Sequence, residues 1–172
     1  MTHKIFGVIG WKNSGKTTLM ASLLEEFTRR GHIVSAIKHA HHSFDIDHPG
    51  RDSFKFREAG ARQVALISPK RWALMHEFRD EEEPDFDEIL SHIGPCDLVL
   101  VEGYKGGPFP KVEARSSRSL TQEPLSGDDP HIVAIASEGD TNTGKLPGFD
   151  VNDIVAIADF ITGHLGVEKT RS

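Results

Sequence analysis

Residues 10–17, with the sequence GWKNSGKT, fit the pattern G-x-x-x-x-G-K-[ST] of the phosphate-binding P-loop. The segments on either side agree with this interpretation. The apolar run 5–9 is typical of a short buried strand, and apolar residues recur at helical spacing between 19 and 27. A strand, a glycine-rich loop and a helix in this order are the start of an α/β fold, so this segment constrains the fold more than any other.

The P-loop predicts a binding site for the phosphates of a nucleotide. A helix N-terminus offers unpaired N–H groups and a partial positive charge to an anion. Gly10 and Gly15 let the backbone curve around that anion without a Cβ in the way. We expect Lys16 to reach the β- and γ-phosphates and the Thr17 hydroxyl to bind a bridging Mg²⁺ ion. The rest of the loop and the first helical turn are expected to surround the same phosphates, namely Lys12, Asn13, Ser14 and Thr18. The alternative is a glycine turn that caps an ordinary helix.

Composition and charge narrow the class of protein. Of the 172 residues, 37% are hydrophobic and 27% charged, which predicts one globular nucleotide-binding domain over 1–172. The net charge of −6 argues against a nucleic-acid partner. No apolar run is long enough to span a membrane, and the first residues lead directly into a strand with no signal peptide. Cys96 is the single cysteine and is expected to be a buried, inert thiol. We therefore expect a cytoplasmic protein with no membrane contact.

Alternating strand and helix patterns predict an α/β fold, a three-layer P-loop NTPase domain with a mostly parallel central sheet. Strands are expected at 5–9, 33–37, 64–67, 72–75, 97–101, 111–114 and 132–136, of which the third and fourth form a hairpin. Helices are expected from 18 onward, through 59 with Asp52 or Ser53 as its cap, near 86–93, and over 154–164 with Asn152 or Asp153 as its cap. The segments 115–130 and 138–148 are expected to be surface loops. Ligands of such sheets bind beyond the carboxyl ends of the strands.

Glu102 ends the apolar strand expected at 97–101. An acidic side chain at this place, beside a P-loop, suits the hard oxygen coordination that Mg²⁺ prefers. Glu102 could bind the ion directly, hold one of its waters or orient an attacking water. The alternative is a charged residue that closes a strand at the surface.

The segment 38–48 carries four of the ten histidines and two aspartates. Three interpretations compete: a transition-metal site, contact with phosphate or an anionic cofactor with Asp45 or Asp47 on Mg²⁺, and a polar exposed loop. The spacing matches no zinc signature. Lys38 and Arg51 add positive charge beside the loop, which favours an anionic ligand.

These motifs together resemble the molybdopterin-guanine dinucleotide biosynthesis protein B (MobB) family, over about residues 4 to 165. The resemblance is carried by the P-loop, by KHAHH with FDID at 38–47, by PGRDS at 49–53, by AGA at 59–61 and by VEGYK at 101–105. The histidine loop followed by PGRDS is its most specific part.

Membership would imply a homodimeric GTP-binding protein with at most slow GTPase activity. Such a protein assists the molybdopterin guanylyltransferase that joins molybdopterin to GMP, and molybdopterin is a further candidate ligand. The resemblance implies GTP and Mg²⁺ as cofactors, with Lys16 and Glu102 as catalytic residues and with Thr17, Asp45 and Glu102 at the metal. It also places His39, His41 and His42 in the family's histidine loop, as contacts to the bound nucleotide.

Two departures from related P-loop proteins bear on mechanism. Dimeric relatives in the wider class often carry a lysine, donated across the dimer, where this chain has Trp11. The Asn-Lys-x-Asp signature that reads guanine is absent, which leaves 136–138 with Asp140 or Asp153 as the candidate base-reading region.

Two other functions fit the same P-loop. A small-molecule kinase or synthetase would close an arginine-bearing lid over the phosphates, and Arg115 and Arg118 lie in a loop that could do this. A metallochaperone would use the histidine loop.

Overall fold

The computed structural model describes residues 3–40, 46–139 and 142–168. Its contacts cluster into two compact units, which are described one at a time: Met1–His39 with Ile93–Ser172, here the sheet unit, and Ala40–His92, here the hairpin unit. The single domain expected over 1–172 stays a prediction. Among the described residues, no helix combines the length and the apolar character needed to cross a membrane.

The sheet unit is built on six strands in the order β2-β5-β1-β6-β7-β8, and every neighbouring pair is parallel. The strands are β1 (Ile5–Ile9), β2 (Val34–Lys38), β5 (Leu98–Glu102), β6 (Lys111–Arg115), β7 (Ile132–Ser137) and β8 (Gly148–Asp150). The helices are α1 (Lys16–Arg29), α4 (Ile154–Leu165) and the short 3₁₀ turn η1 (Leu125–Gly127). This arrangement confirms the predicted α/β class with a mostly parallel sheet.

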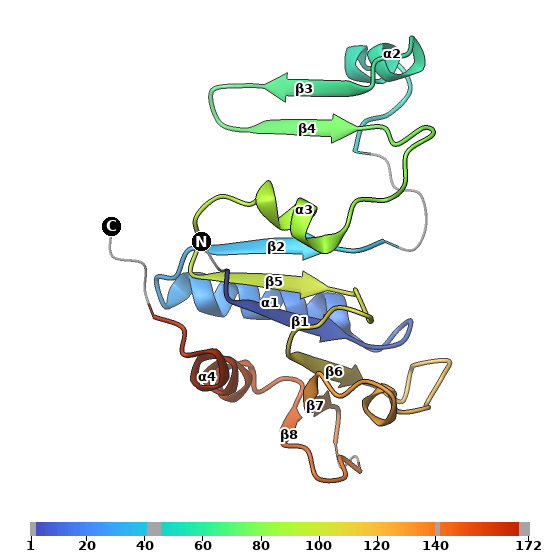
Figure 1. The fold of residues 1–172 in the computed structure, drawn as a ribbon. Helices are drawn as coiled ribbons and strands as arrows, with labels where there is room; N and C mark the ends of the chain where they lie inside the picture. Colours follow the sequence, from blue (N-terminus) through green and yellow to red (C-terminus); the bar gives the residue numbers. More distant parts are fainter. Residues whose placement is uncertain (1–2, 41–45, 140–141, 169–172) are drawn as a thin grey trace. The chain divides into compact units, whose positions relative to one another are not determined.

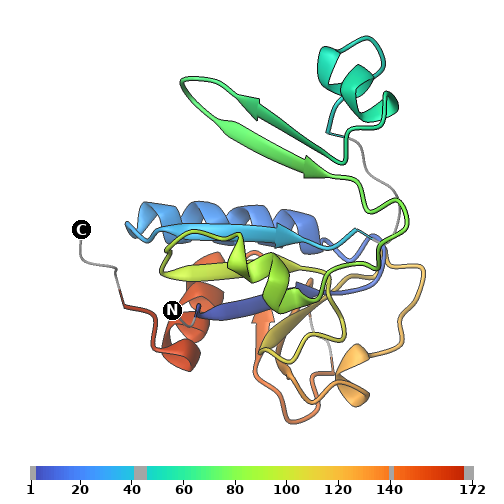
Figure 2. The ribbon, with the colours of Figure 1, turned by 45° about the horizontal axis from the view of Figure 1, so that its top comes forward.

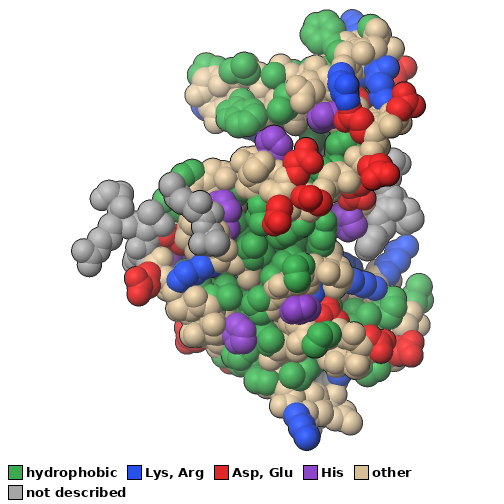
Figure 3. All heavy atoms as spheres, in the orientation of Figure 1, with side chains coloured by type: hydrophobic (Ala, Val, Ile, Leu, Met, Phe, Trp, Pro, Cys, Tyr) green, Lys and Arg blue, Asp and Glu red, His purple; other side chains and the backbone are tan. Residues whose placement is uncertain are grey.

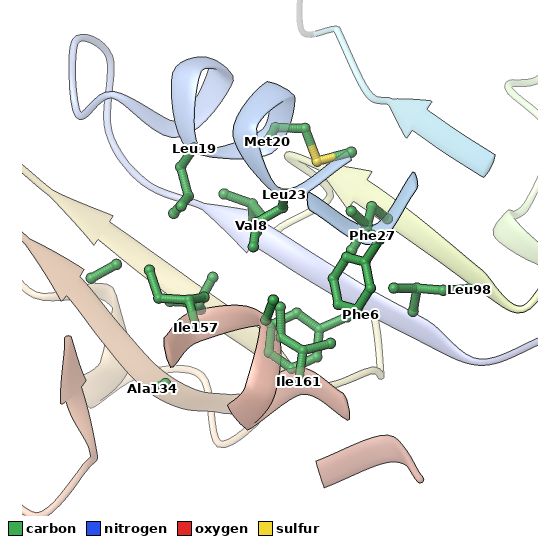
Figure 4. Close-up of a cluster of buried hydrophobic side chains, with 14 of the residues drawn as sticks. Phe6, Val8, Leu19, Met20, Leu23, Phe27, Leu98, Ala134, Ile157 and Ile161 are labelled. Atoms are coloured by element: carbon green, nitrogen blue, oxygen red, sulfur yellow. The ribbon is translucent and has the colours of Figure 1, made fainter. Parts of the chain in front are cut away.

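Helices α1 and α4 contact each other and share one apolar core with the sheet. Phe6 and Val8 alternate with Gly7 along β1, so both point to the same face of the sheet. Leu23 of α1 and Ile161 of α4 are fully buried in the same cluster, and Figure 4 shows these side chains converging from the sheet and the two helices. This core fixes the direction in which α1 leaves the P-loop.

The carboxyl ends of β1, β2 and β5 lie at one edge of the sheet, as their parallel pairing requires. Figures 1 and 2 show the three arrows pointing the same way. Lys38 at the end of β2 is in register with Glu102 at the end of β5, and Val8 of β1 is in register with the same glutamate. The P-loop, the start of the histidine loop and the segment after Glu102 therefore leave the sheet side by side, as predicted.

Several predicted elements differ from the observed ones, most of them by one or two residues at an end. Strand β5 begins at Leu98, one residue after the predicted start. Asp97 contacts Ile33 instead: its carboxylate accepts a hydrogen bond from the N–H of Ile33 at 2.7 Å, and its own N–H donates to the carbonyl oxygen of Ile33 at 2.8 Å. Helix α1 begins at Lys16, two residues before the predicted start. Strand β8 begins at Gly148, the last residue of the segment expected as a loop, and was not predicted, because a three-residue strand with a glycine has little sequence signal. The residue at the N-cap of α2 is Arg51, not Asp52 or Ser53.

The hairpin unit contains α2 (Asp52–Glu58), β3 (Gln63–Ile67), β4 (Trp72–His76) and α3 (Phe86–Ser91). Strands β3 and β4 pair antiparallel, which confirms the predicted hairpin. Val64 and Met75 are buried on one face of it. The other face, here the hairpin face, consists of Ala65, Ile67, Trp72 and Leu74, and Figure 3 shows hydrophobic side chains gathered on this part of the surface.

Candidate nucleotide-binding site

The loop between β1 and α1 has the backbone geometry of an anion-binding turn. A Cβ on Gly10 would lie 2.3 Å from the Ser14 hydroxyl oxygen and 2.5 Å from the carbonyl oxygen of Ala114, so only glycine fits there. Gly15 occupies the N-cap of α1 with φ 82°, and the space around the position of its missing Cβ is open. No side chain caps the helix, so its first N–H groups are available to a bound anion.

Two polar side chains of the loop, Lys16 and Ser14, are placed to contact a bound anion. The Lys16 ammonium donates a hydrogen bond to the carbonyl oxygen of Trp11 at 3.2 Å, so the side chain folds back over the loop. Ser14 is 2% exposed, and its hydroxyl has no hydrogen-bond partner among the described residues. A buried polar group without a partner costs free energy, and an anion in the loop would repay that cost. The side chains of Lys12, Asn13 and Thr18 are exposed around the same loop.

Thr17 and Glu102 meet where the sequence predicts a magnesium site. The Thr17 hydroxyl donates a hydrogen bond to Oε1 of Glu102 at 2.8 Å. The Lys38 ammonium lies 3.3 Å from the same oxygen, and the side chain of Glu102 is only 7% exposed. These hard oxygen donors, beside the P-loop lysine, fit Mg²⁺ with its remaining positions filled by water and phosphate. Thr17 and Glu102 would hold the ion, which would offset the negative charge of bound phosphates.

The histidine loop is described only in part. The N–H of His39 donates to the carbonyl oxygen of Glu102 at 2.9 Å, and its ring lies edge-on to Tyr104 with ring centroids 4.8 Å apart. His39 therefore lies beside the Glu102 end of the site. His41, His42 and Asp45 lie outside the described residues.

Asp47, the alternative to Asp45 as a metal ligand, is used elsewhere. It is buried in the hairpin unit and accepts a hydrogen bond from Arg57 at 2.5 Å. Burial alone would raise the pKa of Asp47, but the hydrogen bonds from Ser53 and Arg57 hold this pKa below its ordinary value. Over residues 3–40, 46–139 and 142–168, no group of three or more His, Cys, Asp or Glu side chains could hold a metal ion.

Lys105 also lies at the P-loop, which the sequence analysis did not predict. Its Nζ lies 3.7 Å from the centroid of the Trp11 ring, and the indole N–H of Trp11 donates to the carbonyl oxygen of Glu123 at 2.7 Å. Two sequence signals could have suggested this role: Lys105 follows Glu102 closely, and it belongs to the segment VEGYK at 101–105.

A cavity of about 360 Å³ adjoins the P-loop in the sheet unit. Its walls come from the loop and α1, from Glu138 after β7, and from Asn152 after β8. The Glu138 carboxylate is 43% exposed and has two long contacts, 3.4 Å to the Ser116 hydroxyl and 3.7 Å to the Arg118 guanidinium. This open carboxylate lies in the region expected to read the base. Asp140 lies outside the described residues.

Two other residues considered for the site have structural partners. Asp153 caps α4 by accepting a hydrogen bond from the N–H of Ala156 at 3.1 Å, as predicted. Arg115 donates to the buried Glu113 at 2.8 Å and to the carbonyl oxygen of Asn142 at 2.9 Å, so it is anchored. An anchored arginine does not fit the mobile lid that a kinase would need, whereas Arg118, the other arginine considered for a lid, is 79% exposed at the cavity wall.

Comparison with known proteins gives consistent matches. Residues 5–138 match the family model for molybdopterin guanine dinucleotide synthesis protein B (MobB). The molybdopterin-guanine dinucleotide biosynthesis adapter protein of Escherichia coli (strain K12) is 40% identical over 154 residues, which cover 88% of this chain and 87% of the relative. The adapter protein of Haemophilus influenzae is 38% identical over 166 residues, covering 94% and 89%. A crystal structure of Bacillus subtilis MobB superposes with a TM-score of 0.74 at 26% identity, covering 96% of this chain and 99% of that one.

Proposed function

The chain belongs to the MobB family of adapter proteins in molybdopterin guanine dinucleotide biosynthesis, and we propose that it does this work by binding GTP with Mg²⁺ at its P-loop. The observation that carries the proposal is the hydrogen bond of 2.8 Å between Thr17 and Glu102, beside the uncapped N-terminus of α1. This arrangement supports an anion site next to a hard cation site, as a magnesium–triphosphate complex requires.

Guanine recognition is proposed for the cavity beside the P-loop. The Watson–Crick edge of guanine presents two adjacent donors, the ring N1–H and the 2-amino group. The two oxygens of the Glu138 carboxylate match these donors. Adenine presents a ring acceptor at the same place, which a carboxylate repels. The exposure of Glu138 at the cavity wall leaves it accessible to a base.

Hydrolysis of GTP is proposed to be slow. Trp11 replaces the lysine that related dimers donate across their interface, and Arg115 is held by Glu113 and Asn142. Few groups therefore remain to offset the charge that develops on the phosphates in the transition state. Lys16 and Glu102 would supply most of that stabilisation, directly and through Mg²⁺.

An adapter must contact other proteins, and we propose a homodimer that also docks on the molybdopterin guanylyltransferase in the cytoplasm. The apolar hairpin face supports a protein contact: Ile67 is 83% exposed and Trp72 is 69% exposed. Large apolar side chains gathered on an exposed surface are typical of interaction sites. Molybdopterin itself is a further candidate ligand.

The proposal is tested by the binding of GTP, GDP and ATP to the purified chain and to Lys16→Ala, measured by calorimetry with and without Mg²⁺. The wild-type protein should prefer GTP and bind it more tightly with Mg²⁺. Lys16→Ala should weaken GTP binding by roughly 100-fold, the cost of removing a charged phosphate contact. Lys145→Ala removes the same charge from an exposed place and should bind normally. Wild-type affinity in a folded Lys16→Ala protein would overturn the proposal.

A further inference from the structure

Trp11, the second residue of the P-loop motif, is contacted by two lysines. Lys16 reaches its carbonyl oxygen at 3.2 Å from within the loop. Lys105 reaches the face of its indole ring at 3.7 Å, from the segment that follows β5. The two ammonium groups thus meet the same residue from two different parts of the sheet unit.

Within the described part of the chain, the positive charges of Lys16 and Lys105 are not offset by a nearby carboxylate. Among the described residues, neither Lys16 nor Lys105 has a carboxylate within ion-pair distance. Glu113 attracts Lys105 from a distance, but its oxygens already accept hydrogen bonds from the N–H groups of Leu125 and Ser126 and from Arg115. Burial, and then the positive charge of Lys16, lower the pKa of Lys105. The two ammonium groups repel each other, and a bound anion would offset that repulsion.

The ring of Trp11 holds the Lys105 ammonium at the P-loop by a cation–π contact. The indole N–H donates to the carbonyl oxygen of Glu123 at 2.7 Å, so the ring is fixed to the loop that follows β6. An ammonium over an aromatic face is attracted to it but keeps its hydrogen-bond donors available. Lys105 can therefore exchange the ring for a phosphate oxygen by rotating its own side chain.

The position of Lys105 indicates which phosphate it would meet. Glu102, three residues earlier, pairs with Thr17 at the place proposed for Mg²⁺. In P-loop proteins that ion bridges the β- and γ-phosphates. The segment after Glu102 would therefore adjoin the terminal phosphate of a nucleotide bound in the P-loop.

We propose that Lys105 binds the γ-phosphate of the nucleotide in the P-loop of its own chain, and so makes the site selective for a triphosphate over a diphosphate. The proposal rests on the proposed nucleotide function and adds to it a residue that senses the presence of the γ-phosphate. It supplies within one chain a cation that Trp11 has displaced from the second P-loop position.

Calorimetry with GTP and with GDP, both with Mg²⁺, tests this role in Lys105→Ala, Lys105→Arg, Lys16→Ala and the control Lys145→Ala. Lys105→Ala should weaken GTP binding by about 10- to 100-fold, as expected for one charge-assisted hydrogen bond. It should change GDP binding by less than about twofold, and Lys105→Arg should keep most of the GTP affinity. Equal losses for GTP and GDP, or no loss, would overturn the inference. If Lys16→Ala also binds normally, the P-loop function itself fails.

The fluorescence of Trp11 gives a second measurement. The chain has two tryptophans, so in a Trp72→Phe background only Trp11 reports. GTP should change its emission differently from GDP, because Lys105 leaves the ring only for the triphosphate. That difference should vanish in Lys105→Ala and persist in Lys145→Ala. Identical responses to GTP and GDP in the parent protein would contradict the proposal.

Discussion

The Thr17 hydroxyl hydrogen-bonds to Oε1 of Glu102 at 2.8 Å, which joins the start of α1 to the end of β5. Lys38 lies 3.3 Å from the same oxygen and offsets the charge of this nearly buried carboxylate. The proposed cation site is therefore built before any cation enters, and Mg²⁺ would take over the role of Lys38. Little reorganisation is then needed when the magnesium–nucleotide complex binds.

Glu102→Gln tests whether this pair holds the metal. The amide keeps the shape of the side chain but loses the charge that attracts Mg²⁺. We expect Mg²⁺ to enhance GTP binding in the wild-type protein and to lose most of that effect, about tenfold or more, in the variant. Calorimetry in Mg²⁺ and in EDTA measures the difference. Glu168→Gln makes the same change at an exposed place and is the control. Full magnesium enhancement in Glu102→Gln would assign the metal to other ligands.

The parts of the candidate site that the sequence itself indicates are those set by local pattern. Gly10, Gly15, Lys16 and Thr17 lie within eight residues, so one motif fixes their spacing. The sequence indicates Glu102 as a candidate because it ends a strand of continuous apolar residues, and the structure confirms that strand, with all five residues of β5 buried. Parallel strands then bring these two segments to one edge of the sheet.

The parts that the sequence does not predict depend on contacts between distant segments. Nothing in the pattern around Lys105 indicates that its ammonium will lie over Trp11. Asp47 and Asp45 look equivalent as metal ligands in the sequence, yet Asp47 is buried with Arg57 in the hairpin unit. Arg115 likewise looks free for catalysis until its partner Glu113 is located.

Glu138→Gln tests the proposed reading of guanine. A carboxamide has one acceptor and one donor, so it matches xanthine, which carries a ring N1–H beside a C2 carbonyl. We expect the variant to lose about tenfold or more in GTP affinity and to gain affinity for xanthosine triphosphate. Competition binding with GTP and xanthosine triphosphate measures this change in nucleotide preference. Glu123→Gln, on the loop after β6, is the comparison variant. An unchanged preference for GTP in Glu138→Gln would exclude this carboxylate as the base reader.

Glu26→Gln tests the pH dependence of stability in the sheet unit. Hydrogen bonds from Arg29, and then from Arg30, lower the pKa of Glu26 from 4.5 to about 2. A carboxylate whose pKa is lower in the folded state stabilises the fold above its unfolded pKa. That contribution is lost as the pH falls from about 4.5 to about 2. We therefore expect the variant to be less stable than the wild type at pH 7, with the gap closing over this acid range.

Denaturant unfolding at a series of pH values measures this gap. Glu25→Gln, at the exposed neighbouring position of α1, is the control and should follow the wild type more closely. Other carboxylates with lowered pKa values, such as Asp129, are present in all three proteins, so they cancel in the comparison. A gap that stays constant from pH 7 to the acid end would show that Glu26 acts through packing instead of charge.

Trp72→Glu tests whether the hairpin face is the surface through which two copies associate. Trp72 is 69% exposed and pairs across the hairpin with Ile67, whereas Val64 and Met75 hold the other face in place. A carboxylate at the centre of an apolar interface must lose its water without gaining a partner. We expect the dimer dissociation constant to rise by about 100-fold or more, because exposed aromatic anchors dominate such contacts.

Sedimentation over a range of concentrations measures this change, and GTP calorimetry on the same sample shows that the P-loop is intact. Lys145→Glu introduces a carboxylate at an exposed place of the sheet unit and should leave a dimer that depends on Trp72. A wild-type protein that stays monomeric would overturn the proposed dimer. A Trp72→Glu protein that remains dimeric would place the interface elsewhere, since an unpaired charge cannot be buried between two copies without a large loss of affinity.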